Sequence, residues 1–338
     1  MLIRGSGHKD GILVPIPQYP LYSASIALLG GVLVPYSLDE EDDWGMNCRS
    51  ITTAIDKARA KGITVRGLCF INPGNPTGQQ LPAAQILEML KICHKEKVTL
   101  LADEVYQDNV YANAASGTKP FVSARSVLAK AGGKLLDEVQ LVTFHTTSKG
   151  AMGECGLRGG MMEIHNGPAD VVDQMYKLAS INLSPNVPGQ VALGIMLNPP
   201  KPGEESHSLW EEERKEILLS LGRRAKAITD ALNTLPGVSC VSAGSLYAFP
   251  RIEIPPRAIQ AAAESNMAPD VLYCLELLKS TGIATTPGSG FGQKDGTFHF
   301  RTTILVQESK LEMFIKELCR FHNEFLTKYG GAGFAAKL

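Results

Sequence analysis

Four short apolar runs, each ending in a turn of polar residues or prolines, constrain the fold of this sequence more than any other feature. The runs are rich in Val, Ile and Leu and lie at residues 12–16, 65–71, 98–102 and 139–142. Such runs, separated by helix-like stretches, are typical of the buried strands of a parallel sheet. We therefore predict an α/β fold with a mostly parallel sheet flanked by helices.

The turns after these runs carry side chains that can do chemistry. Tyr19, Asn75, Asp103 and Lys149 each follow one of the four runs. Because open α/β sheets bind ligands at the carboxyl ends of their strands, we expect these four residues to share one site. A lysine amine becomes a nucleophile only in a dry pocket or beside another cation. A solvated loop lysine is the alternative for Lys149 alone, but with the other three residues we predict that it is the nucleophile.

Composition limits the ligands and partners of the chain. The formal net charge is −1 and no basic run occurs, which argues against binding nucleic acid or a membrane surface. No stretch is long and apolar enough to span a membrane. The seven cysteines are scattered and never spaced as CxxC, so we predict neither a disulfide framework nor a zinc site. Small molecules are the ligands that remain.

The length of 338 residues allows two domains. Residues 198–206 contain three prolines and a glycine and form the best linker in the sequence. We predict a large domain over residues 1–200 and a smaller α+β domain over residues 201–338.

Two long helices are expected in the smaller domain. Ser208 with Glu211, and Ser309 with Glu312, have the spacing of a capping box, which predicts a helix start at each serine. After the first box, one apolar stripe predicts a helix with one buried face, made of Ile217, Leu221, Ala225, Ile228 and Leu232.

Three motifs, taken together, resemble a known family. Residues 72–78 read Asn-Pro-Gly-Asn-Pro-Thr-Gly, residues 103–106 read Asp-Glu-Val-Tyr, and Lys149 is followed by Gly156-Leu157-Arg158-Gly159-Gly160. In this order they resemble the fold-type-I aminotransferases, which use pyridoxal phosphate, over roughly residues 11–305. Residues 15–22 (Pro-Ile-Pro-Gln-Tyr-Pro-Leu-Tyr) and the segment from Lys149 to Gly160 are similar to the alanine aminotransferase branch of that family.

The resemblance implies roles around the cofactor ring. Lys149 would hold pyridoxal phosphate as a Schiff base and later move the proton at the substrate Cα. Asp103 would face the pyridine nitrogen and keep it protonated, the alternative being a helix N-cap. Asn75 and Tyr106 would donate hydrogen bonds to the phenolic oxygen, although Tyr106 could instead be structural. Tyr19 would stack on the ring, with a core aromatic residue as its alternative.

Further roles concern the cofactor phosphate and the substrate. Arg158, with the Thr146 and Ser148 hydroxyls, would bind the phosphate by charge-assisted hydrogen bonds. Arg301, with Asn75, would bind the substrate α-carboxylate, the alternative for Arg301 being an internal ion pair. We assign no catalytic role to His145, His299 or Cys155, and we predict no bound metal.

The resemblance also implies a missing element. Members of this family carry, before the position of Met1, a glycine-rich turn that opens a helix and binds the cofactor phosphate through backbone N–H groups. We therefore expect an N-terminally truncated member whose large domain is incomplete.

These observations favour transfer of the amino group of L-alanine to 2-oxoglutarate, giving pyruvate and L-glutamate. Glutamate:glyoxylate transamination and a catalytically inactive fragment are the alternatives. Amino acids and 2-oxo acids are the expected substrates, and a homodimer is the expected assembly. The expected location is cytoplasmic or mitochondrial, while the terminal Ala336-Lys337-Leu338 resembles a peroxisomal address.

Overall fold

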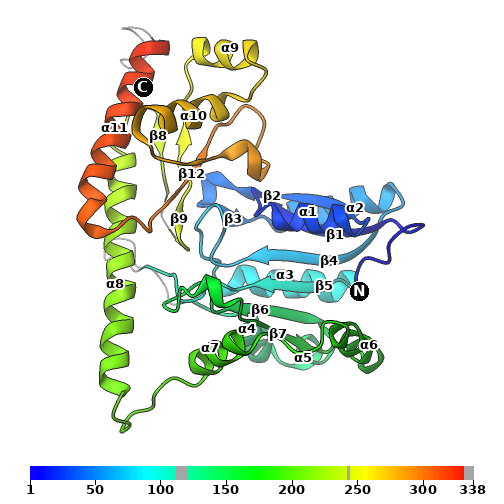
Figure 1. Cartoon of the computed structure of the whole chain (residues 1–338). Coiled ribbons are helices and arrows are strands. Elements are labelled where there is room, and N and C mark those ends of the chain that lie inside the picture. The colour runs from blue at the N-terminus through cyan, green and yellow to red at the C-terminus, as the bar shows by residue number, and fades with distance from the viewer. Residues whose placement is uncertain (112–120, 242–243, 331–338) are drawn as a thin grey trace.

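A seven-stranded sheet forms the centre of the molecule (Figure 1). The computed structural model describes residues 1–111, 121–241 and 244–330. In spatial order the strands are β3 (Gly45–Met46), β2 (Val32–Asp39), β1 (Asp10–Ile16), β4 (Thr64–Ile71), β5 (Thr99–Asp103), β6 (Leu141–Thr146) and β7 (Gly160–His165).

The five inner strands run parallel, whereas β3 and β7 at the two edges are antiparallel to their neighbours. The expected α/β fold with a mostly parallel sheet is therefore confirmed. The four predicted strands are β1, β4, β5 and β6, which lie next to one another in the sheet. Their carboxyl ends meet at one edge, as the site prediction requires.

Helices and short 3₁₀ turns connect these strands and cover the sheet (Figure 1). They are α1 (Leu21–Leu28), η1 (Glu40–Asp42), α2 (Cys48–Ala60), α3 (Ala83–Glu96), α4 (Ala124–Ala131), α5 (Gly133–Glu138), η2 (Cys155–Leu157), α6 (Ala169–Ser180) and α7 (Val187–Leu197).

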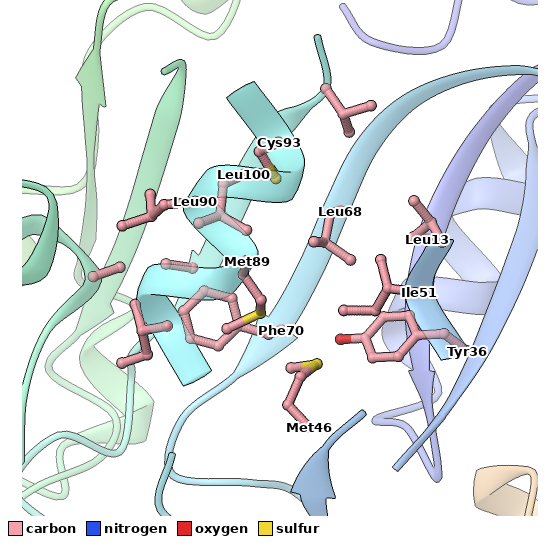
Figure 2. Packing of buried hydrophobic residues seen from close by; sticks show 14 of the residues in the cluster. Leu13, Tyr36, Met46, Ile51, Leu68, Phe70, Met89, Leu90, Cys93 and Leu100 are labelled. Atoms are coloured by element: carbon pink, nitrogen blue, oxygen red, sulfur yellow. The ribbon is translucent and has the colours of Figure 1, made fainter. Parts of the chain in front are cut away.

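The two faces of the sheet have separate cores, because successive side chains of a strand point to opposite faces. Leu13 belongs to the cluster packed by α2 and α3, while its neighbours Ile12 and Val14 pack with Ile26 of α1. Figure 2 shows the larger core, where Ile51 of α2 and Met89 of α3 meet the strands. Burial of these apolar side chains is what holds the sheet and helices together.

The rest of the chain forms a separate hydrophobic core beside the sheet, in addition to the cores on its two faces. Figure 1 shows α8 (His207–Leu232) and α11 (Glu308–Gly330) side by side at one edge of the molecule. The other elements are β8 (Val238–Ser239), β9 (Tyr247–Ala248), β10 (Arg251–Ile252), α9 (Pro256–Glu264), α10 (Pro269–Thr281), β11 (Thr286–Pro287), η3 (Gly288–Phe291) and β12 (Phe300–Thr303). Two aromatic residues of this part, Phe249 and Phe291, are buried in the core of the large sheet. The division of the chain into domains at residue 200 stays a prediction.

Both predicted capping boxes are wrong. Helix α8 begins at His207 and α11 at Glu308, so Ser208 and Ser309 lie inside their helices. The first turn of α8 is already closed before Ser208, because the Trp210 N–H donates to the Ser206 carbonyl at 3.0 Å. The apolar stripe of α8 is correct from Leu221 onward, but Ile217 is 43% exposed. Among the described residues, no helix is long and apolar enough to cross a membrane.

Glu104 connects the sheet to α4. Its side chain is buried, and Oε1 accepts a hydrogen bond of 2.6 Å from the backbone N–H of Ala124, the first residue of α4. Burial is the main cause that raises the pKa of Glu104 to about 7, and the charges of Asp103 and Glu163 act in the same direction. The Ala124 N–H opposes this shift.

We expect Glu104→Gln to become more stabilising, relative to the parent chain, as pH rises. The pKa of Glu104 is 4.5 in the unfolded chain and about 7 in the folded chain. At pH values between these two, the folded chain keeps a proton that the unfolded chain has released, so the free energy of unfolding of the parent falls as pH rises. Glutamine keeps the acceptor for Ala124 but does not titrate. From pH 5 to pH 8, the free energy of unfolding of the variant should rise relative to that of the parent by about 2 kcal/mol.

Denaturant unfolding at both pH values measures this difference. Glu212→Gln, at an exposed position of α8, is the control and should show no such trend. A constant difference between Glu104→Gln and the parent would contradict the expectation.

Candidate active site

The candidate site lies where β1, β4, β5 and β6 end. Asp103 is the last residue of β5, and Lys149 follows the end of β6 at Thr146. Asn75 follows β4, and Tyr19 follows β1. The strands are neighbours, so the topology brings these predicted residues to the same edge of the sheet.

Asp103 is the centre of this edge. Its Oδ2 accepts a hydrogen bond of 2.5 Å from the Tyr22 hydroxyl, and its Oδ1 lies 3.4 Å from the Val105 backbone N–H. Burial is the largest influence and raises the pKa of Asp103, while the Tyr22 hydrogen bond, the Val105 N–H and the charge of Lys149 lower it. A desolvated carboxylate with a lysine nearby is typical of a functional site.

The segment that follows β5 holds the Lys149 loop in place. The backbone N–H of Gly150 donates to Asn109 Oδ1 at 2.9 Å, and Asn109 is fully buried. Gly150 has φ 67°, and a Cβ atom there would lie 2.7 Å from Asp108 Oδ2. The loop therefore needs glycine at this position. Lys149 Nζ lies 5.5 Å from the centroid of the Tyr106 ring.

Asn75 joins two other predicted residues. Its Nδ2 donates to the Tyr106 hydroxyl at 3.4 Å, and its Oδ1 accepts from Arg301 NH1 at 2.9 Å. Tyr106 is buried, and burial is the main cause that raises its pKa. The structure thus places Asn75 between a residue predicted to contact the cofactor and one predicted to bind substrate.

Arg301 lies against aromatic rings. Its guanidinium carbon is 4.1 Å from the centroid of Tyr247 and 4.9 Å from that of Phe291. These rings hold the cation by cation–π attraction and limit its rotamers. The hydrogen-bond partner that the structure gives Arg301 is an amide, Asn75, which leaves the guanidinium charge available to an anion.

The residues predicted to bind phosphate are partly assembled. Thr146 Oγ1 lies 3.1 Å from Ser148 Oγ and 2.8 Å from the Gly159 carbonyl oxygen. The guanidinium of Arg158 is exposed and donates to the Cys155 carbonyl at 2.9 Å. The structure therefore brings the two hydroxyls together but turns the Arg158 side chain toward its own loop.

Tyr19 lies at the surface of the candidate site, with its side chain 39% exposed. Its carbonyl accepts from the Tyr22 backbone N–H at 3.2 Å, at the start of α1. The predicted stacking of Tyr19 on a cofactor ring stays a prediction.

Sequence reasoning missed several residues of this site. Tyr22 lies in the Pro-Gln-Tyr-Pro-Leu-Tyr segment that drew attention to Tyr19, and this repeated tyrosine was a usable signal. Asn109, Tyr247 and Phe291 had no such signal, because their importance comes from contacts between segments far apart in sequence.

The donor set fits pyridoxal phosphate. A protonated pyridine nitrogen needs a desolvated carboxylate, which Asp103 provides near the amine of Lys149. The Asn75 amide and the Tyr106 hydroxyl are hydrogen-bond donors for an oxygen of the ring. The Ser148 hydroxyl and the Arg158 guanidinium, which is exposed, are donors suited to a phosphate.

Comparison with known proteins gives one family. The family model described as aminotransferase class I and II matches residues 1–318. The chain is 53% identical over 329 residues to glutamate–glyoxylate aminotransferase 1 of Arabidopsis thaliana, covering 97% of this chain and 67% of that protein. It is 49% identical over 325 residues to the mitochondrial alanine aminotransferase 2 of the same plant, covering 96% of this chain and 59% of that protein. The chain thus spans about two thirds or less of the length of these relatives.

A solved structure is also similar. An alanine aminotransferase from Pyrococcus furiosus superimposes with a TM-score of 0.75 at 28% sequence identity. The similarity covers 94% of this chain and 71% of the archaeal one. The arrangement of sheet and helices described above is therefore that of solved aminotransferases.

We expect Gly150→Ala to lower the free energy of unfolding by about 2 kcal/mol, because a side chain in left-handed backbone costs about 1–2 kcal/mol and the new Cβ would also press on Asp108. Gly153→Ala is the matched control, since Gly153 has φ 62° and a Cβ atom there would meet nothing within 4 Å. Denaturant unfolding should show that the alanine at 150 is the more destabilising of the two. Equal effects would mean that Asp108 does not constrain the Lys149 loop.

Proposed function

Because the chain belongs to the class I and II aminotransferases, we propose that it moves the amino group of L-alanine to 2-oxoglutarate, giving pyruvate and L-glutamate. The observation that carries the proposal is the hydrogen bond of 2.9 Å between Arg301 and Asn75. Asn75 also contacts Tyr106, whose ring lies 5.5 Å from Lys149 Nζ, which supports the proposal that the Arg301 cation binds the α-carboxylate of an amino acid held near Lys149.

In this proposal Lys149, Asp103, Asn75, Tyr106, Tyr19, Thr146, Ser148 and Arg158 hold pyridoxal phosphate. When bound, the cofactor supplies an electron sink that stabilises negative charge at the substrate Cα. Asp103 would hold a proton at the pyridine nitrogen, for which its desolvated carboxylate is suited. Asn75 and Tyr106 donate to the phenolic oxygen, and the hydroxyls with Arg158 take the phosphate.

The protein side chains also control the substrate. Arg301 grips the α-carboxylate with two parallel N–H groups, which fixes the orientation of Cα. The Tyr247 and Phe291 rings keep the guanidinium in place and exclude water from its faces. Lys149 would then take the proton from the substrate Cα as a general base and deliver it to C4′ of the cofactor as a general acid.

A second candidate is the transfer of an amino group from glutamate to glyoxylate. The relative that is 53% identical is named for that reaction, which leaves both the amino donor and the 2-oxo acid acceptor open. Both reactions use the same residues in the roles above. A third outcome, a catalytically inactive chain, would appear as no turnover with either substrate pair.

The assembly proposed is a homodimer. Large apolar side chains are exposed together on α6, the turn after it and α7, namely Tyr176, Ile181, Leu183, Val187 and Val191. An apolar surface of this kind on a soluble protein marks a contact with another chain, and a second copy is the commonest partner. Sedimentation should give twice the chain mass of 36.4 kDa, and a stable monomer would contradict the dimer.

The location proposed is cytoplasmic or mitochondrial, with the peroxisome as a further possibility from the terminal Ala336-Lys337-Leu338. These three residues lie outside the described residues. Imaging a fluorescent protein fused to the N-terminus, with and without the last three residues, distinguishes the peroxisome from the other compartments.

We expect Lys149→Ala to abolish transamination, because no other group proposed for the site can act as the base at the substrate Cα. The assay measures the amino acid formed from L-alanine with 2-oxoglutarate and from L-glutamate with glyoxylate, using the chain loaded with pyridoxal phosphate. Lys177→Ala, on α6, is the control and should keep full activity. Normal turnover in Lys149→Ala would contradict the proposed role, and a faster glyoxylate reaction in the parent would select the second candidate.

We expect Arg301→Lys to raise the KM for L-alanine about tenfold, while kcat falls much less. Lysine keeps the charge but loses one of the two parallel N–H contacts, which is worth on the order of 1.4 kcal/mol. Steady-state kinetics with varied L-alanine measures both constants. An unchanged KM would show that Arg301 does not bind the α-carboxylate.

A further inference from the structure

A buried histidine lies two residues before Arg301. His299 is only 1% exposed and immediately precedes β12, and its backbone pairs with Arg251 in an isolated bridge. Side chains two positions apart on an extended strand share a face, so His299 and Arg301 project to the same side. The mechanism proposed above gives His299 no role.

Both ring nitrogens of His299 face hydrogen-bond acceptors. Nε2 lies 2.9 Å from Glu40 Oε1, and Nδ1 lies 2.9 Å from Gln293 Oε1. The orientation of the Gln293 amide follows from its other contact, because its Nε2 donates to Asp270 Oδ2 at 3.1 Å. The amide oxygen therefore faces the histidine. Both ring nitrogens must then donate, which only the imidazolium form can do.

We propose that His299 is held as an imidazolium between Glu40 and Gln293 and acts as a positioning residue for Arg301, an inference whose functional meaning rests on the proposed function. His299 touches neither substrate nor cofactor in this account. It fixes the strand and the aromatic surface on which the Arg301 guanidinium lies.

The path from His299 to Arg301 is a series of packed rings. His299 stacks on Phe249 with a centroid distance of 4.8 Å and an interplanar angle of 4°. Phe249 meets Phe291 edge-on at 5.8 Å, and the Arg301 guanidinium lies 4.9 Å from Phe291. A shift of the imidazole therefore moves the ring that supports the arginine.

A second path runs through the turn that carries Phe291. Gln293 binds His299 at one end and Asp270 at the other, and Asp270 Oδ2 also accepts from the Ser289 N–H at 2.6 Å. A Cβ atom at Gly288 would lie 2.8 Å from His299 Cβ and 2.3 Å from Gln293 Oε1. This turn is thus packed directly against the histidine and cannot move independently of it.

The Glu40 contact ties this unit to the large sheet. Glu40 lies in η1, directly after β2, and Trp44 from the same connection meets the His299 ring at 5.5 Å. The charged group that contacts the histidine is Glu40, whose Oε2 lies 3.6 Å from Arg251 NH1. Asp270 is the next charged group, and it is connected to the histidine through Gln293. Glu41 lies 3.9 Å from Arg251 but is 90% exposed.

A hydrogen-bond donor inside the fold that loses its acceptor is unfavourable, so the two contacts of His299 hold its ring in place. Glu40 is the partner from η1, and its side chain is 22% exposed. Replacing Glu40 by glutamine weakens the contact at Nε2. The predicted consequence is a looser Arg301 and weaker binding of the substrate carboxylate.

Nitrogen NMR of chain labelled with ¹⁵N-histidine tests the protonation state directly, with His299→Asn to assign the signals. Near neutral pH both ring nitrogens of His299 should give the chemical shifts of N–H nitrogens. A single protonated nitrogen, as in a neutral tautomer, would overturn the proposal. This measurement needs no turnover, so it stands even if the proposed function fails.

The positioning of Arg301 is tested in chain labelled with ¹⁵N-arginine. Glu40→Gln should change the chemical shift of the Arg301 Nε–H signal. Glu41→Gln is the matched control and should leave this signal in place. An Arg301 signal that Glu40→Gln leaves unchanged would overturn the positioning role.

Kinetics then connects the ion pair to substrate binding. Glu40→Gln should raise the KM for L-alanine about fivefold at pH 8 while kcat changes less than twofold. Glu41→Gln should leave both constants unchanged. Equal effects of the two substitutions, or a fall in kcat alone, would contradict a role through the carboxylate-binding arginine.

Discussion

The desolvated carboxylate of Asp103 is the constraint on which the candidate site depends. Burial alone would favour its neutral form, and the pKa of Asp103 is raised for that reason. The Tyr22 hydroxyl at 2.5 Å and the charge of Lys149 act in the opposite direction and help the carboxylate to ionise. A cationic ring nitrogen bound at this point would complete the compensation. The strand order brings Tyr22 of α1, Asp103 at the end of β5 and Lys149 after β6 to one edge of the sheet.

The C-terminal part of the chain supplies the other half of the site through aromatic packing. Arg301 donates a hydrogen bond to Asn75, and Phe249 and Phe291 are buried in the core of the large sheet. The His299–Glu40 contact also joins the C-terminal part to the large sheet. The residues proposed to bind cofactor and those proposed to bind substrate therefore belong to one continuous set of contacts, through which we propose that η1 influences the arginine.

Much of the fold follows from the sequence because strand periodicity and turn residues are local signals. Tyr19, Asn75, Asp103 and Lys149 could be assigned to the ends of apolar runs before any contact was known. The helix starts at Ser208 and Ser309 were wrong because a capping-box spacing does not exclude a helix that begins one residue earlier. Tyr247, Phe291 and Asn109 could not be found, since only the tertiary structure brings them to Arg301 and to the Lys149 loop.

An absorbance spectrum of the purified chain with added pyridoxal phosphate, before and after L-alanine is added without any acceptor, tests whether this sheet edge binds the cofactor. We expect an absorbance band of lysine-bound cofactor that is lost when L-alanine is added, because the groups around Asp103 and Lys149 are proposed to hold the cofactor and Arg301 to orient the amino acid. The absence of any band would contradict the assembly of a cofactor site at this sheet edge. A band that L-alanine leaves unchanged would contradict the substrate role given to Arg301.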